Sequence, residues 1–200
     1  MSTTDPRLTG KTLNLPTYRR ACELWKENQT FSRALVFLGA KLADANHFCN
    51  RLARQTDEIN SSNQPVGPGR WRTVSREADA FIFAVYGALD AYTQVAARVA
   101  GVATDREIKF PQLSRLLAEE SRTPVRWAAL REWMEGTYRA RWFVALRRMR
   151  NEVNYRSVLP YPLKQPLRMR GPLDWPATYR NVIHCVETGL GYLVNVKQSL

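Results

Sequence analysis

The chain has 200 residues and a mass of 23.0 kDa, which is the size of one ordinary domain. Hydrophobic residues make up 44% of it, so the composition is globular and excludes a disordered or collagen-like chain. Thirty Lys and Arg against 18 Asp and Glu give a net charge of +12, and 24 of the 30 cations are arginine. This excess favours a polyanionic partner, because guanidinium is well suited to phosphate.

The first 16 residues are expected to form an N-terminal arm, and residues 17–200 a single helical domain. Apolar residues then recur at steps of three and four, which predicts a long helix over about Thr30–Asn60. Pro, Gly and small polar residues from Ser61 to Gly69 predict a chain reversal.

A second long helix is expected to begin at an N-cap formed by Thr73 or Ser75 and to end at Gly101. A short helix is predicted from about Pro111 to Glu120. Thr123 and Pro124 then predict the start of a segment that runs to Glu135. These spacings favour an all-α fold.

Gly136 is expected to interrupt the helical pattern, and a further helix is predicted over about Thr137–Asn154. Five prolines among the twenty residues from Ser157 to Pro176 exclude a helix there and predict a basic, Pro-rich loop at about residues 156–173. Asp174 is expected to cap the last helix. The fold class predicted from these elements is a helical bundle, in which two long antiparallel helices pack against two or three shorter ones.

Three dispersed cysteines, Cys22, Cys49 and Cys185, give neither a disulfide framework nor a zinc site, and each is expected to be a small core residue. They fit a reducing compartment, so we expect a cytoplasmic protein. The N-terminus lacks the apolar stretch of a signal peptide, and the apolar runs are too short for a membrane span.

Positive charge is concentrated late in the chain. Between Arg126 and Arg180 there are twelve Arg or Lys and four acids, so this segment carries +8 of the total +12. Tyrosines and tryptophans lie among these cations, as on many nucleic-acid-binding surfaces. The alternative is that the arginines only decorate solvated helix faces.

One flank of the helix predicted to end near Asn154 combines guanidinium and carboxamide groups. On a helical wheel, Arg147, Arg150, Asn151 and Asn154 fill an arc beside the apolar residues of the same helix. Such an arc can bind a phosphate and orient a ribose. The alternative is a solvated flank beside the core.

This segment, ALRRMRNEVNYRS, resembles the HEPN (higher eukaryotes and prokaryotes nucleotide-binding) superfamily. The signature of that family is an Arg, usually followed by Asn, and a His four to six residues after the Arg. Arg150 and Asn151 match it, and EADAFIFAVYGALDAYTQVAARVAG is similar to the apolar second helix of bacterial members.

The resemblance implies a helical bundle that forms a homodimer, in which paired motifs line a shared cleft. Many members are metal-independent ribonucleases, so it implies an electrostatic role for Arg150 and a positioning role for Asn151. The position of the His is held by Tyr155, whose phenol titrates near 10 and is a poor base at neutral pH. Catalysis is therefore expected to be weak or absent.

Three further residues could contribute to a site. His47 and His184 are the only imidazoles, and both are expected to be packing or surface residues, which leaves no metal site. Asp90 lies near the apolar stripe of the second long helix and needs a partner there. It either forms a structural salt bridge or a polar helix contact, or it faces the cleft and orients Arg150 or a neighbouring Arg.

Three functions remain open. The first is an RNA-binding protein without a cofactor, in which catalysis is weak or absent. Arg150, Asn151 and Tyr155 would hold the catalytic positions. The second is a divergent metal-independent endoribonuclease that uses Arg150 and Tyr155, and the third is a module that binds a protein partner. The RNA-binding residues predicted for the first function are Arg147, Arg148, Asn154, Arg156, Lys164, Arg168 and Arg170.

Overall fold

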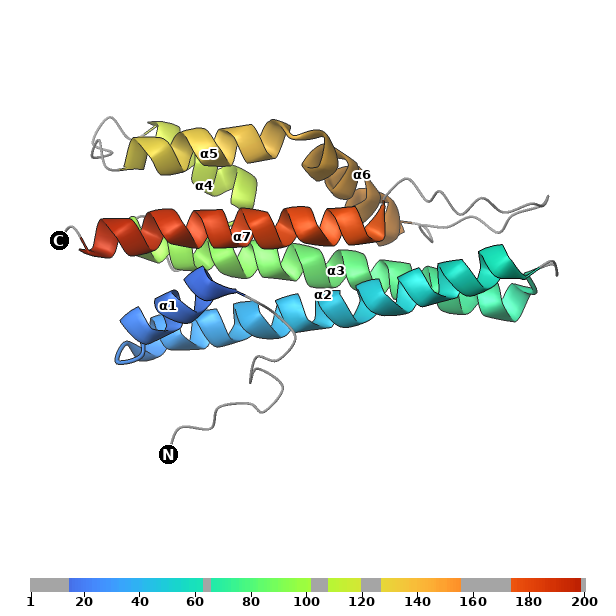
Figure 1. The fold of residues 1–200 in the computed structure, drawn as a ribbon. Coiled ribbons are helices and arrows are strands. Elements are labelled where there is room, and N and C mark those ends of the chain that lie inside the picture. The colour runs from blue at the N-terminus through green and yellow to red at the C-terminus, as the bar shows by residue number, and fades with distance from the viewer. Residues whose placement is uncertain (1–14, 63–65, 102–107, 120–126, 156–173, 199–200) are drawn as a thin grey trace.

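The computed structural model describes residues 15–62, 66–101, 108–119, 127–155 and 174–198. For Ser114, Ala118, Glu119 and residues 152–155 it describes the backbone alone. Within these ranges the fold is an all-α bundle, so the predicted fold class is confirmed (Figure 1). Its helices are α1 (Pro16–Leu24), α2 (Gln29–Ser61), α3 (Pro68–Val99), α4 (Phe110–Glu119), α5 (Ala128–Arg139), α6 (Arg141–Tyr155) and α7 (Trp175–Gln198).

The two long helices, α2 and α3, lie antiparallel and form the main pair of the bundle (Figure 1). α2 begins where predicted, because the Asn28 side chain accepts hydrogen bonds from the Thr30 and Phe31 amides, both at 3.2 Å. α3 begins earlier than predicted, with Gly67 as its N-cap and Pro68 in its first turn. The predicted caps were wrong, since Thr73 and Ser75 both lie inside this helix.

Two further boundaries differ from the prediction. Gly136 does not interrupt a helix, because it lies within α5. The burial of Leu130 and Met134 in the core stabilises this helix by more than the roughly 1 kcal/mol that one helical glycine costs. The break falls at Ala140, which has extended backbone angles. α1 was not predicted as a helix, and Thr123 and Pro124 lie outside the described residues.

The last helix, α7, lies along the α2–α3 pair and contacts both helices (Figure 1). As predicted, Asp174 caps it, since its carboxylate accepts a hydrogen bond from the Ala177 amide at 2.8 Å. At Gly189 the helix comes so close to its neighbours that an added Cβ would lie 2.5 Å from the Tyr92 hydroxyl and 2.7 Å from the Trp133 ring. A glycine is therefore required at this contact.

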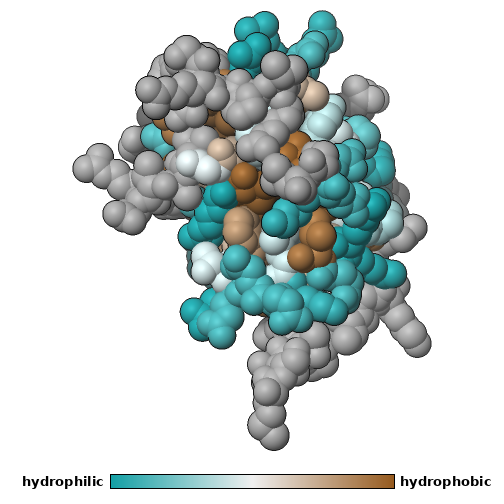
Figure 2. Space-filling view, turned by 90° about the vertical axis from the view of Figure 1, so that its left-hand side faces the viewer, coloured by the Kyte–Doolittle hydropathy of each residue, from teal (hydrophilic) through white to brown (hydrophobic). Residues whose placement is uncertain are grey.

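One hydrophobic core runs through the bundle and receives side chains from every helix. Cys49 and Cys185 are buried in it as predicted, and Cys22 is half-buried. α3 is long and apolar enough to cross a membrane by length and composition, but most of its apolar stretch is buried among the other helices. Figure 2 shows apolar side chains in the middle of one end of the bundle, with hydrophilic side chains around them.

Candidate nucleic-acid interface

The helix α6 carries the predicted arginine cluster and is fixed to the bundle by its apolar side. Leu146 and Met149, two residues of the predicted apolar stripe, are buried, and so is Phe143. Arg147 and Arg150 are half-buried on the neighbouring flank. The next members of the cluster, Arg148 and Asn151, are exposed to solvent.

Arg150 lies against a tyrosine of α3. The centre of its guanidinium is 4.6 Å from the centroid of the Tyr86 ring, which is a cation–π contact. The Tyr86 side chain is only 8% exposed. The Nε atom of Arg150 and the hydroxyl oxygen of Tyr86 are both buried and have no hydrogen-bond partner among the described residues. Two polar atoms of one contact therefore lack a hydrogen-bond partner in the described part of the chain, although buried polar groups usually have one.

Arg147 is held in the same manner by a second tyrosine. Its guanidinium centre lies 4.8 Å from the centroid of the Tyr138 ring, and one of its Nη atoms donates a hydrogen bond to the Tyr138 hydroxyl. Tyr138 belongs to α5, on the other side of the break at Ala140. The corner between α5 and α6 thus positions this arginine.

The electrostatics of Tyr86 connect these groups. Burial raises the pKa of Tyr86 above its usual value, and the positive charges of Arg150 and Arg147 counteract part of this rise. The Asp90 carboxylate and Tyr138 add to the rise in pKa. Tyr86 therefore keeps its proton at neutral pH, so it can donate a hydrogen bond but cannot act as a general base there.

Asp90 lies one turn after Tyr86 on α3 and is half-buried. It lines an open groove between α2 and α3, so it faces a surface depression and is not embedded in the apolar stripe as a lone acid. Its charge acts on Tyr86, which contacts Arg150. Asp90 thus belongs to the electrostatic surroundings of the arginine cluster.

No carboxylate in the described part of the chain forms an ion pair with Arg147 or Arg150. The ion pairs found there join other residues, mostly neighbours on one helix or partners between α2 and α3. The positive charges of these two neighbouring guanidinium groups on α6 are therefore not neutralised by any described carboxylate. Such a pair can donate several hydrogen bonds to one phosphate.

The remaining predicted site residues are only partly placed. The backbone of α6 carries Asn154 and Tyr155 at its end, but their side chains are not among those described. His47 and His184 are exposed, and no group of three possible metal ligands occurs within the described ranges. The predicted residues that lie outside the described ranges are Arg156, Lys164, Arg168 and Arg170.

Sequence reasoning missed the two tyrosines that hold the arginines. Tyr86 comes directly after Val85 of the apolar stripe, and Tyr138 lies in the segment where a helix start was predicted. Their aromatic and polar character was the available signal, because buried tyrosines commonly pair their ring with an apolar or cationic neighbour. Which arginine each tyrosine contacts depends on how α6 crosses the bundle.

Comparisons with protein-family models, with curated proteins and with solved structures found no match to this chain.

Proposed function

We propose that this chain is a HEPN-like RNA-binding protein, which recognises phosphate through the arginine cluster of α6. The observation that carries the proposal is Arg150, which lies 4.6 Å from the Tyr86 ring centroid with its Nε buried and without a partner among the described residues. An arginine held in this way is oriented before it binds. A phosphate can therefore bind without the entropic cost of first ordering the side chain.

The charge balance supports an anionic ligand at this place. Arg147 and Arg150 lie on one flank of α6, and no described carboxylate pairs with either. A phosphate diester could accept a hydrogen bond from each of the two guanidinium groups. The same contact releases counterions from RNA, which contributes most of the affinity at low salt.

In this proposal the RNA surface continues beyond the pair on α6, and the protein acts as a homodimer in the cytoplasm without a cofactor. Catalysis is weak or absent, because Tyr155 replaces the histidine of the family signature. The further residues assigned to RNA binding are Arg148, Asn154, Arg156, Lys164, Arg168 and Arg170.

Retention of a labelled single-stranded RNA on the purified protein tests the proposal. We expect binding at 50 mM salt that weakens steeply as salt rises. Arg150→Met should lower the affinity about tenfold or more, since one charge-assisted contact is worth roughly 1.5 to 3 kcal/mol. Arg141→Met is the matched control, because Arg141 is an exposed arginine on the same helix and its loss should change the affinity much less.

The same samples distinguish the other functions. RNA cleavage in EDTA that Arg150→Met abolishes would identify an endoribonuclease. Cleavage that survives Arg150→Met would reject the assignment of this residue. No retention at low salt would contradict RNA binding and favour a module that binds a protein. A strict monomer in solution would exclude the shared cleft of a dimer.

A further inference from the structure

A second feature of the surface is an open groove of about 370 Å³ between the first half of α2 and the second half of α3. Its volume lies in the range of pockets that bind small molecules or parts of larger ligands. The groove is lined by Thr30, Arg33, Ala34, Phe37, Asp90, Ala91, Gln94 and Arg98.

The groove is cationic at one end. Arg33 and Arg98 are both exposed, and neither forms an ion pair with any residue that the structure describes. They come from opposite helices, near the start of α2 and the end of α3. Asp90 lines the same groove, so the two arginines leave the lining with one net positive charge, which is complementary to an anion.

The other end of the groove offers an aromatic surface. The Phe37 side chain is 52% exposed and borders the small side chains Ala34 and Ala91. The Lys41 ammonium lies 5.4 Å from the centre of the Phe37 ring, and its stem packs against Gly87, where an added Cβ would lie 3.0 Å from the Lys41 Cδ. The Lys41 ammonium thus lies over the Phe37 ring, and about half of the Phe37 side chain stays exposed in the groove that Arg33 and Arg98 also line.

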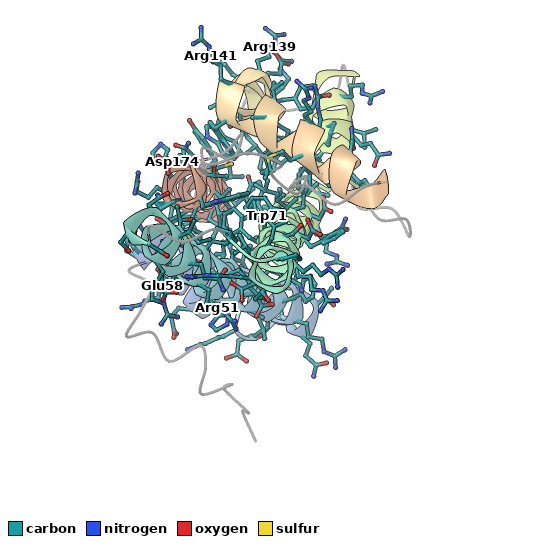
Figure 3. All side chains as sticks on the ribbon, turned by 90° about the vertical axis from the view of Figure 1, so that its right-hand side faces the viewer. Arg51, Glu58, Trp71, Arg139, Arg141 and Asp174 are labelled. Atoms are coloured by element: carbon teal, nitrogen blue, oxygen red, sulfur yellow. The ribbon has the colours of Figure 1, made fainter. Side chains whose placement is uncertain are left out.

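The groove adjoins the arginine cluster of α6. Asp90 lines the groove and is also close enough to Tyr86 to raise its pKa, and Tyr86 contacts Arg150. Figure 3 shows α6 crossing above α3 from the side of α7 toward the opposite side of the bundle. Tyr86 and Arg98 are twelve positions apart on α3, which corresponds to about 18 Å of helix.

We propose that this groove is a second contact site for single-stranded RNA, in which a base stacks on Phe37 and a phosphate lies between Arg33 and Arg98. This inference rests on the proposed function and adds to it a site at which an RNA base stacks. Stacking on an aromatic side chain and backbone contact with cations are the two elements of single-strand binding. At about 3.4 Å per stacked nucleotide, the path from Tyr86 to Arg98 takes about five nucleotides.

Two oligonucleotides and a matched pair of variants test the groove. Phe37→Leu removes the ring from the groove, whereas Phe83→Leu removes an equally exposed ring that does not line it. With a decanucleotide RNA, we expect Phe37→Leu to weaken binding about tenfold and Phe83→Leu less than twofold. With an abasic decamer of the same backbone, Phe37→Leu should have no effect, because there is no base to stack.

The results separate this site from the proposed function. If Arg150→Met weakens binding but Phe37→Leu does not, the groove is not an RNA site and the function stands. An equal effect of Phe37→Leu on both decamers shows a structural disturbance and overturns stacking. If the unchanged protein binds neither decamer at 50 mM salt, both proposals are wrong. Arg33→Met should weaken binding to both decamers, and no change would reject the phosphate contact.

Discussion

The part of the α2–α3 hairpin near its turn and the helix α6 use arginine in two different ways. In the hairpin, Arg51 forms an ion pair with Glu77, and Arg70 forms one with Glu58 at 2.8 Å. In the view of Figure 3, Arg51 and Glu58 lie on the opposite side of the bundle from Arg141, which is at the start of α6. On α6, Arg147 and Arg150 contact tyrosine rings.

This difference shows that the high net charge is not evenly available to a partner. An arginine paired with a carboxylate joins two helices. Because the pair as a whole is neutral, it attracts an anion only weakly. An arginine held by an aromatic ring is ordered but still positive. The arrangement of partners, more than the count of arginines, therefore distinguishes arginines that join two helices from arginines that are available to an anion.

The largest expected effect is on the paired arginine of the hairpin. The Glu77 side chain is 8% exposed, so Arg51→Met leaves a buried carboxylate without its partner. Because Arg51 itself is 42% exposed and partly solvated, we expect a loss of about 3 kcal/mol at the low end of the range for buried pairs. Urea unfolding measures this loss, and RNA affinity should not change. A loss below 1 kcal/mol would show that this pair is not structural.

Alkaline pH weakens the core that supports both regions while the arginines stay charged. Burial raises the pKa of Cys185 to about 12 and that of Cys49 to about 11. An unfolded thiol ionises first, so the stabilising contribution is complete below about pH 8.5 and falls as the pH rises toward these values. The contribution of Cys185 alone should lower the free energy of unfolding by about 2 to 3 kcal/mol by pH 11.

Urea unfolding at pH 8 and pH 10.5 measures this dependence. Cys185→Ala should make the free energy of unfolding less sensitive to pH over this interval. An unchanged dependence in the variant would show that Cys185 does not cause it.

A smaller effect is expected when the aromatic support of Arg150 is removed. Tyr86→Leu should weaken RNA binding about fivefold, because a cation–π contact is worth about 1 kcal/mol. Tyr86→Phe keeps the ring and should bind RNA as the unchanged protein does. The phenylalanine variant should be equally stable, since the lost hydroxyl has no described partner. If both variants bind equally weakly, the hydroxyl is the group that matters.

The smallest effect is expected from the exposed pair of the hairpin. In the pair of Arg70 and Glu58, the two side chains are 42% and 66% exposed, so solvent screens their attraction. Arg70→Met should cost less than 1 kcal/mol in thermal or urea unfolding and should leave RNA affinity unchanged. A clear loss of RNA affinity would show that paired arginines also bind, and the contrast between the two regions would disappear.

Most of the fold was predictable because local patterns determine it. The stripe of α2 and the caps at Asn28 and Asp174 depend on residues within a few positions of each other. The start of α3 was missed because the helix, with Pro68 and the buried Trp71, extends into a segment whose composition predicts a turn. The break at Ala140 was placed at Gly136, although packing of α5 outweighs the preference of one glycine.

The candidate site was only partly predictable. The wheel of α6 placed Arg147 and Arg150 on one flank, because both lie on a single helix. The contact between Arg150 and Tyr86 joins positions 64 residues apart and depends on how α6 crosses α3. The groove between α2 and α3 was missed for the same reason, since Phe37 and Arg98 line one groove only in the folded hairpin.

The most direct test of the account is the salt dependence of RNA binding by a double variant, Arg147→Met with Arg150→Met. Each phosphate contact on single-stranded RNA contributes about 0.7 to the slope of log affinity against log salt. The account predicts a slope about 1.4 smaller than that of the unchanged protein, while Arg51→Met with Arg70→Met leaves the slope as it was. Equal slopes for all three proteins would contradict the claim that Arg147 and Arg150 of α6 bind phosphate.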